Sequence, residues 1–250
     1  MSFFDHLVEL RKRLISALAA VGIGMVVGLA LAKRAIYFVA QPMQAALRAN
    51  HLSDTLYYTS PAGYISLYIN LGLYLGIALA MPWVLYQVWL FVAPGLYRHE
   101  RRAMASFILS AMTLFACGIA FGYFVMLPQV LTFVIHFASG GPVAPLINFN
   151  EYLELIVVVL VGLGVIFEMP VVVFILSVFG IVTPKFLLRN FRYAMLGITI
   201  VAAIVTPTPD ATTMLIFMAP MIALYFVGVI VSYVVLRRKR AQKLAHGEAR

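Results

Sequence analysis

Charge, cysteine and nucleotide-binding motifs are scarce in this sequence. Of its 250 residues only 11% are charged and 64% are hydrophobic, whereas soluble domains are about a quarter charged and about half apolar. Cys117 is the single cysteine, so the sequence holds no disulfide framework and no cysteine metal site. None of the five lysines follows a glycine, and no histidine pair has the spacing of zinc ligands. These absences predict an integral membrane protein that is not an enzyme and has no cofactor or metal.

Long apolar runs predict a single all-α domain over residues 1–250. An amphipathic helix is expected at the membrane surface over residues 3–14, a long loop over 33–64, and a basic tail over 237–250. Six membrane spans are predicted, at about residues 14–32, 65–92, 103–136, 152–181, 193–205 and 211–236. The fifth run would be only about 20 Å long as a helix, so we expect the bilayer to be thinned beside it.

The distribution of cations predicts the orientation of these spans. Six spans place both termini on one side, and fifteen of the eighteen Lys and Arg residues then lie on that side. Because positive residues are enriched in cytoplasmic loops, both termini are expected in the cytoplasm. The net charge of +9 is therefore attributed to orientation, and no nucleic acid partner is expected.

Glu168 is the only ionisable residue well inside the run from Tyr152 to Ile181. A carboxylate at that depth costs roughly 2.5–3.5 kcal/mol on insertion scales, and Pro170 removes a helical hydrogen-bond donor beside it. Gly162 and Gly164 would allow another helix to approach closely. Two interpretations stay open: a protonated acid bonded to a neighbouring helix, or a polar cavity that opens to a substrate or partner.

Two further carboxylates, Glu9 and Glu100, fall on the predicted cytoplasmic side. Each has a purely local interpretation, because Glu9 precedes Lys12 and Arg13 by three and four positions and Glu100 lies in a basic loop. Alternatively, two acids on one face would receive two guanidinium groups through bidentate pairs. The residues alone leave both interpretations open.

Four sequence motifs together carry a resemblance to a known family. The second of them is long and specific, and together they are distributed over essentially the whole chain. They are Phe3-x-x-His6-Leu7-x-Glu9-Leu10-Arg11-x-Arg13; Pro82-x-x-Leu85-Tyr86-Gln87-x-Trp89-x-Phe91-x-x-Pro94-x-Leu96-Tyr97-x-x-Glu100-Arg101; Phe167-Glu168-x-Pro170; and Thr208-Pro209-Asp210. The sequence thereby resembles the TatC family, the large multi-spanning subunits of twin-arginine protein translocases.

The resemblance implies a concave, glove-shaped six-helix bundle in the bacterial cytoplasmic membrane. It implies that the chain binds twin-arginine signal peptides at Glu9 and Glu100, with Leu10, Arg13 and Arg101 at the same site. Folded cargo would be exported with the proton motive force, together with the single-span subunits TatA and TatB and with self-association. The residues Glu168 and Pro170 would then form an intramembrane polar site on the concave face.

The resemblance also places partner docking near the fifth and sixth spans, at Thr206, Thr208, Asp210 and Met214. Met214 departs from the family pattern, where a glutamine is expected, and hydroxyls at Thr206, Thr208, Thr212 and Thr213 are the expected substitutes. From its position alone, Asp210 is expected to cap the amino terminus of the last helix.

Two other functions remain as alternatives. A proton-coupled transporter would use Glu168 as a relay, but such folds usually carry internal repeats and further buried polar groups, which this sequence lacks. A scaffold that only gathers partners would bind no signal peptide.

Overall fold

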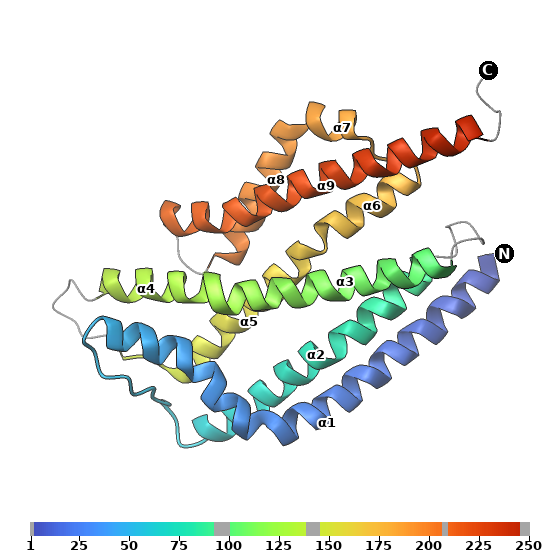
Figure 1. Ribbon diagram of the computed structural model, residues 1–250. Helices are drawn as coiled ribbons and strands as arrows, with labels where there is room; N and C mark the ends of the chain where they lie inside the picture. Colours follow the sequence, from blue (N-terminus) through green and yellow to red (C-terminus); the bar gives the residue numbers. More distant parts are fainter. Residues whose placement is uncertain (1–2, 93–100, 139–145, 207–209, 246–250) are drawn as a thin grey trace.

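The chain is almost entirely helical in the computed structural model, which describes residues 3–92, 101–138, 146–206 and 210–245 (Figure 1). Those ranges contain no named strand, and the one isolated bridge pairs Tyr57 with Asn148. The helices are α1 (Phe3–Ala49), α2 (Gly63–Val92), α3 (Arg101–Phe121), a π-helical turn η2 (Gly122–Met126), α4 (Leu127–Ala138), α5 (Phe149–Phe167), α6 (Met169–Val178), α7 (Pro184–Arg189), α8 (Phe191–Val205) and α9 (Ala211–Ala245).

Helix α1 corrects two predicted boundaries. The expected surface helix at 3–14 and the first span at 14–32 are one uninterrupted helix of 47 residues. The loop expected over 33–64 begins only after Ala49. At 1.5 Å per residue α1 is about 70 Å long, roughly twice the thickness of the hydrocarbon core. Lys33, Arg34 and Arg48, which were expected in that loop, all lie on this helix.

Pro42 lies inside α1, where a proline kinks a helix, and Figure 1 shows that α1 is bent along its length. A proline removes the N–H that would bond to the carbonyl four residues earlier, here that of Phe38. The hydroxyl of Tyr123, in η2, donates to that carbonyl at 2.7 Å, and the two rings stack 4.4 Å apart. The hydroxyl of Tyr152, in α5, donates to the neighbouring carbonyl of Val39 at 2.9 Å. Distant helices therefore complete the backbone bonding at this bend.

Helices α1 and α2 form an antiparallel pair with very close backbones (Figure 1). A Cβ atom on Gly24 would lie 2.4 Å from the carbonyl oxygen of Gly76. On Gly28 it would lie 2.1 Å from that of Gly72. Neither position has room for a side chain, so the four glycines fix the register of the two helices.

Helices α3, η2 and α4 form one long rod between the α1–α2 pair and the α8–α9 pair, and α5–α6 crosses that rod obliquely (Figure 1). The crossing is close because Gly118 meets Gly164, where an added Cβ on Gly118 would lie 2.9 Å from the Cα of Gly164. The close approach predicted for Gly164 is thus confirmed, and Gly162 packs against Val205.

The predicted span at 152–181 is not one helix, because α5 ends at Phe167 and α6 begins at Met169. Glu168 lies at the junction, and its N–H donates to the carbonyl of Val165 at 3.1 Å. Pro170 occupies the first turn of α6, where a proline is tolerated. The interruption therefore falls where the proline predicts it.

Five helical stretches in the described ranges are long and apolar enough to cross a membrane. Helix α8 is also apolar but has only 15 residues, about 22 Å, so the expected short helix is confirmed. Helix α9 continues into the predicted tail as far as Ala245, and its Lys239 donates to the carbonyl of Val178 in α6. The amino end of α1 and the carboxyl end of α9 lie at the same end of the bundle (Figure 1).

Candidate functional site

Glu9 and Arg13 form an ion pair on the first turns of α1. Nη2 of Arg13 lies 3.0 Å from Oε1 of Glu9, and the two side chains are 28% and 21% exposed. This is the local pairing that the spacing predicts, and such an i,i+4 pair is worth only about 0.3–0.5 kcal/mol. The pair is therefore weak enough for a ligand to break.

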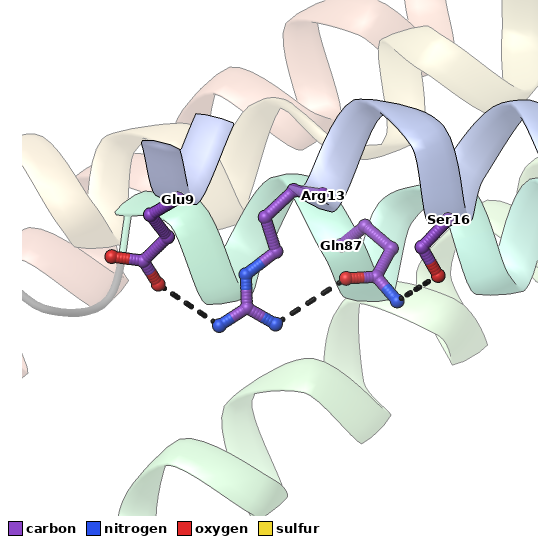
Figure 2. Close-up of polar contacts among 4 residues, drawn as sticks. All are labelled: Glu9, Arg13, Ser16 and Gln87. Carbon is purple, nitrogen blue, oxygen red and sulfur yellow. Dashed lines mark hydrogen bonds and ion pairs between the residues drawn. The ribbon is translucent and has the colours of Figure 1, made fainter. Parts of the chain in front are cut away.

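Arg13 also reaches across to α2, as Figure 2 shows. Its Nη1 donates to Oε1 of Gln87 at 3.3 Å. Nε2 of Gln87 donates to Oγ of Ser16 at 2.9 Å, and the indole N–H of Trp83 donates to the same oxygen at 3.2 Å. Because its amide nitrogen is held by Ser16, the buried side chain of Gln87 presents its oxygen to the guanidinium.

The glycine contacts between α1 and α2 also determine which polar side chains of the two helices come together. Arg13 precedes Gly24 by eleven positions, and Gln87 follows Gly76 by eleven positions. Eleven residues are about three helical turns, so the register that pairs Gly24 with Gly76 also pairs Arg13 with Gln87. Gln87 was not among the site residues predicted from the sequence, and the matched glycine spacings on the two helices are the signal that could have identified it.

The other residues predicted for the signal-peptide site are only partly placed. Leu10, on α1, is exposed. Glu100 lies outside the described residues, and Arg101 opens α3 but its side chain also lies outside them. The described part of the site is therefore its α1–α2 half.

Glu168 is buried, with 7% of its surface exposed. Within the described residues neither of its carboxylate oxygens has a hydrogen-bond partner. The described residues hold no other buried carboxylate or cation, and they include no cluster of three or more potential metal ligands. A proton relay would need further buried groups, so this arrangement does not favour the transporter alternative.

A cleft of about 620 Å³ lies close to the α5–α6 junction. It runs between the rod and α9, with Phe167, the neighbour of Glu168, on its α5 side. Its lining is apolar except for Gln129 and consists of Phe121, Val125, Met126, Gln129, Phe167, Ile216, Ala219, Pro220, Ala223, Leu224 and Val227. The π-helical turn η2 contributes to this wall, and such turns are frequent at functional sites.

The residues expected for partner docking lie around the α8–α9 turn. Asp210 caps α9, because its Oδ2 accepts from the N–H of Thr213 at 2.6 Å, which confirms the predicted cap. Thr206 is buried and donates to the carbonyl of Ala202 at 2.6 Å. Met214 packs against the buried core, and Thr208 lies outside the described residues.

Two of the four threonines proposed as substitute hydroxyls are turned inward. Thr206 and Thr213 are both buried. Among the threonines that the structure describes at this turn, only Thr212 is exposed. The polar docking surface suggested by the sequence is thus smaller than expected.

Comparison with known proteins gives consistent matches over the whole chain. Residues 5–220 match the family model described as Sec-independent protein translocase protein (TatC). The TatC protein of Koribacter versatilis is 40% identical over 249 residues, which cover 100% of this chain and 91% of that protein. The TatC protein of Deinococcus radiodurans is 39% identical, covering 92% and 85% of the two chains. A crystal structure of the twin arginine translocase receptor TatC superimposes with a TM-score of 0.77 at 30% identity, covering 92% and 99% of the two chains.

Proposed function

The chain belongs to the TatC family of Sec-independent protein translocase proteins, and we propose that it is the translocase subunit that receives twin-arginine signal peptides. Membership of this family makes the chain a multi-pass membrane protein and a component of a protein translocase. Its function therefore lies in transport. The proposal concerns the ligand, its site and the partners.

One observation carries the proposal: Glu9 already accepts a guanidinium, that of Arg13, at 3.0 Å. The carboxylate is partly exposed at the end of the bundle where α1 begins and α9 ends. A ligand guanidinium would find the same acceptor there, with a second acid, Glu100, proposed for the second arginine. The sign of the charge and the geometry of the acceptor both suit an arginine-bearing peptide.

The apolar part of the signal peptide would occupy the cleft between the rod and α9. Its volume and apolar lining suit a hydrophobic segment. The cleft extends to Phe167, so a bound segment would end close to Glu168. Glu168 would then act after recognition rather than during it, because its carboxyl is buried whereas the Glu9–Arg13 pair at the start of α1 is partly exposed.

The remaining parts of the proposal concern the surroundings of the chain. We place it in the bacterial cytoplasmic membrane with both termini inside and six crossings, α8 being the shortest. TatA and TatB, as single-span helices, would dock near α8 and α9, and the assembly would use the proton motive force. Six helices cannot enclose a pore for folded cargo, so self-association and these partners are part of the mechanism.

Peptide binding to the purified full-length chain in lipid nanodiscs tests the receptor role. We expect a twin-arginine signal peptide to bind more tightly than the same peptide with both arginines changed to lysine, because lysine lacks the planar fork. Glu9→Gln should weaken binding of the arginine peptide about tenfold or more, the scale of a lost hydrogen bond to a charged group.

Glu154→Gln is the matched control, because it removes an exposed carboxylate from α5. It should leave binding of the arginine peptide unchanged. Equal binding of the arginine and lysine peptides by the wild-type chain would remove the receptor function and leave the scaffold alternative.

A further inference from the structure

We infer that the apolar cleft between the rod and α9 holds one hydrogen-bonding site, formed by the side-chain amide of Gln129 and the backbone carbonyl of Ile216. The site would take a hydroxyl-bearing side chain, serine or threonine, at one position of an apolar segment bound in the cleft. The inference deepens the proposed function and rests on it, because it assumes that the apolar part of the signal peptide occupies this cleft.

Pro220 creates the backbone half of the site. It lies inside α9 and has no N–H, so the carbonyl of Ile216, four residues earlier, lacks its usual helical donor. Within the described residues no side chain donates to that carbonyl. The carbonyl of Phe38, which Pro42 releases in the same way, does accept from the hydroxyl of Tyr123. The carbonyl of Ile216 is therefore the one of the two that remains available to a ligand.

The released carbonyl lies on the wall of the cleft. Ile216 and Pro220 are about one helical turn apart, and both line the cleft. A helical carbonyl points along the axis toward the residue four positions later, so the oxygen of Ile216 lies on the face that Pro220 presents to the cleft. Ala219 and Ala223 line the same stretch of α9, and such small side chains let another chain approach a helix backbone closely.

Gln129 supplies the side-chain half from the opposite wall, on α4. Among the described residues that line the cleft, it alone has a side chain with nitrogen and oxygen atoms. It is exposed, and it takes part in no hydrogen bond within the described part of the chain. A hydroxyl both donates and accepts, so one hydroxyl would donate to the carbonyl of Ile216 and accept from the amide N–H of Gln129.

An entirely apolar segment would cover both polar groups without bonding to either. Leaving a covered donor or acceptor without a partner costs more than an ordinary hydrogen bond contributes. Valine has nearly the shape of threonine but no hydroxyl, so the cleft would distinguish the two through its own polar groups rather than through fit. Sites built to bond a ligand hydroxyl reject the analogue that lacks it for this reason.

A scan of paired peptides tests the site. Each position of the apolar segment of a twin-arginine signal peptide carries valine in one peptide and threonine in its pair, and both dissociation constants are measured on the full-length chain in nanodiscs. The ratio of the valine constant to the threonine constant reports the effect of the hydroxyl at that position. We expect this ratio to peak at one position, about fivefold above the others, which is the scale of one hydrogen bond.

Two substitutions remove the two halves of the site. Pro220→Ala restores an N–H to the carbonyl of Ile216, and Gln129→Leu removes the amide. Each should lower the peak toward the ratio at the other positions. The matched controls are Pro42→Ala and Gln44→Leu, which make the same changes in α1, outside the lining of the cleft, and should leave the peak in place.

Thermal unfolding verifies that each variant is folded. Gln129→Leu leaves the backbone of α9 unchanged, so it tests the inference by itself if Pro220→Ala does not fold.

The outcomes separate this inference from the proposed function. If the wild-type chain does not prefer the arginine peptide over the lysine peptide, the receptor role fails and the inference fails with it. If it has that preference but the ratio is the same at every position of the apolar segment, only the inference is overturned. A peak that is unchanged in Gln129→Leu, or in folded Pro220→Ala, overturns the inference as well, because the site needs both groups.

Discussion

Two prolines of this chain, Pro42 and Pro170, each remove a helical hydrogen-bond donor, and the neighbouring helices respond very differently at the two places. At Pro42 in α1, the hydroxyl of Tyr123 donates to the carbonyl of Phe38 that the proline leaves free. At the α5–α6 junction, Pro170 follows Glu168, whose two carboxylate oxygens have no partner within the described residues. The side chains of Tyr123 and Glu168 are both buried, so the difference lies in whether a neighbouring helix supplies a partner.

The two places therefore differ in kind: the bend at Pro42 is satisfied by a hydrogen bond from another helix, whereas the carboxyl of Glu168 has no partner within the described residues. A buried polar group without a partner costs stability, typically about 1–3 kcal/mol, and other helices of this fold do supply partners where the backbone needs them. The carboxyl of Glu168 is retained next to an apolar cleft at that cost. In the proposed mechanism this group serves a step after signal recognition, whereas the bend at Pro42 only shapes the bundle.

The largest effect is expected from Gly118→Ala, which would separate α5 from α3 just before the Glu168 junction. The added Cβ would lie 2.8 Å from the carbonyl oxygen of Leu163, and backbone atoms cannot turn away from it. We expect the free energy of unfolding to fall by about 2–3 kcal/mol, as in other overpacked cores. Thermal or denaturant unfolding of the purified chain in nanodiscs measures it.

Gly22→Ala is the matched control for that variant, because nothing lies within 4 Å of a Cβ added there. Alanine favours a helix over glycine by roughly 0.5–1 kcal/mol, so this variant should be as stable as the wild type or slightly more stable. If Gly118→Ala behaves in the same way, the close crossing of α3 and α5 does not hold the junction in place.

The next effect concerns Glu168 itself. Glu168→Leu removes a buried carboxyl that lacks a partner, so the free energy of unfolding should rise by about 1–2 kcal/mol. Binding of the arginine peptide should be unchanged, while export of a folded cargo with a twin-arginine signal should be lost. Glu168→Gln, which keeps a polar group there, serves as the control and should change the stability much less.

A loss of stability in Glu168→Leu would contradict the comparison. It would mean that the carboxyl forms a structural contact, as the interpretation of a bonded neutral acid requires. The bend at Pro42 and the α5–α6 junction would then be equivalent.

The smallest expected effect tests whether the hydroxyl of Tyr123 compensates for the hydrogen bond that Pro42 removes. Tyr123→Phe removes the donor to the carbonyl of Phe38 and should lower the free energy of unfolding by about 1 kcal/mol. In a chain that also carries Pro42→Ala, the new backbone N–H can donate to that carbonyl. The same Tyr123 substitution should then cost clearly less, which a double-mutant cycle in nanodiscs would measure. Equal costs in both backgrounds would show that the hydroxyl does not compensate for the proline.

Much of the architecture could be predicted from local sequence. The apolar runs predicted the membrane-spanning helices, including the short α8, and the spacing of Asp210 predicted its cap on α9. The pairing of Glu9 with Arg13 also followed from their separation along one helix. These features depend on residues that are neighbours in the chain, or on the composition of one segment, and so they are encoded locally.

The extension of α1 beyond residue 32 could not be predicted in the same way. The loop predicted over 33–64 rested on Pro42, Asn50, Asp54 and the pair Ser60-Pro61, because a proline disfavours a continuous helix. The helix persists because Tyr123 donates to a carbonyl that Pro42 releases. Likewise, Gln87 joins the site only because two pairs of glycines bring α1 and α2 into one register.

The sequence by itself determined that this chain is an all-helical membrane protein of the TatC family, because composition, hydrophobic length and family motifs are properties of the linear chain. Only the tertiary structure decided that Arg13 is shared between Glu9 and Gln87 and that Glu168 is buried without a partner in the described residues. Both facts depend on which side chains distant helices bring within hydrogen-bonding distance. That distance is set by backbone contacts at Gly24, Gly28 and Gly118.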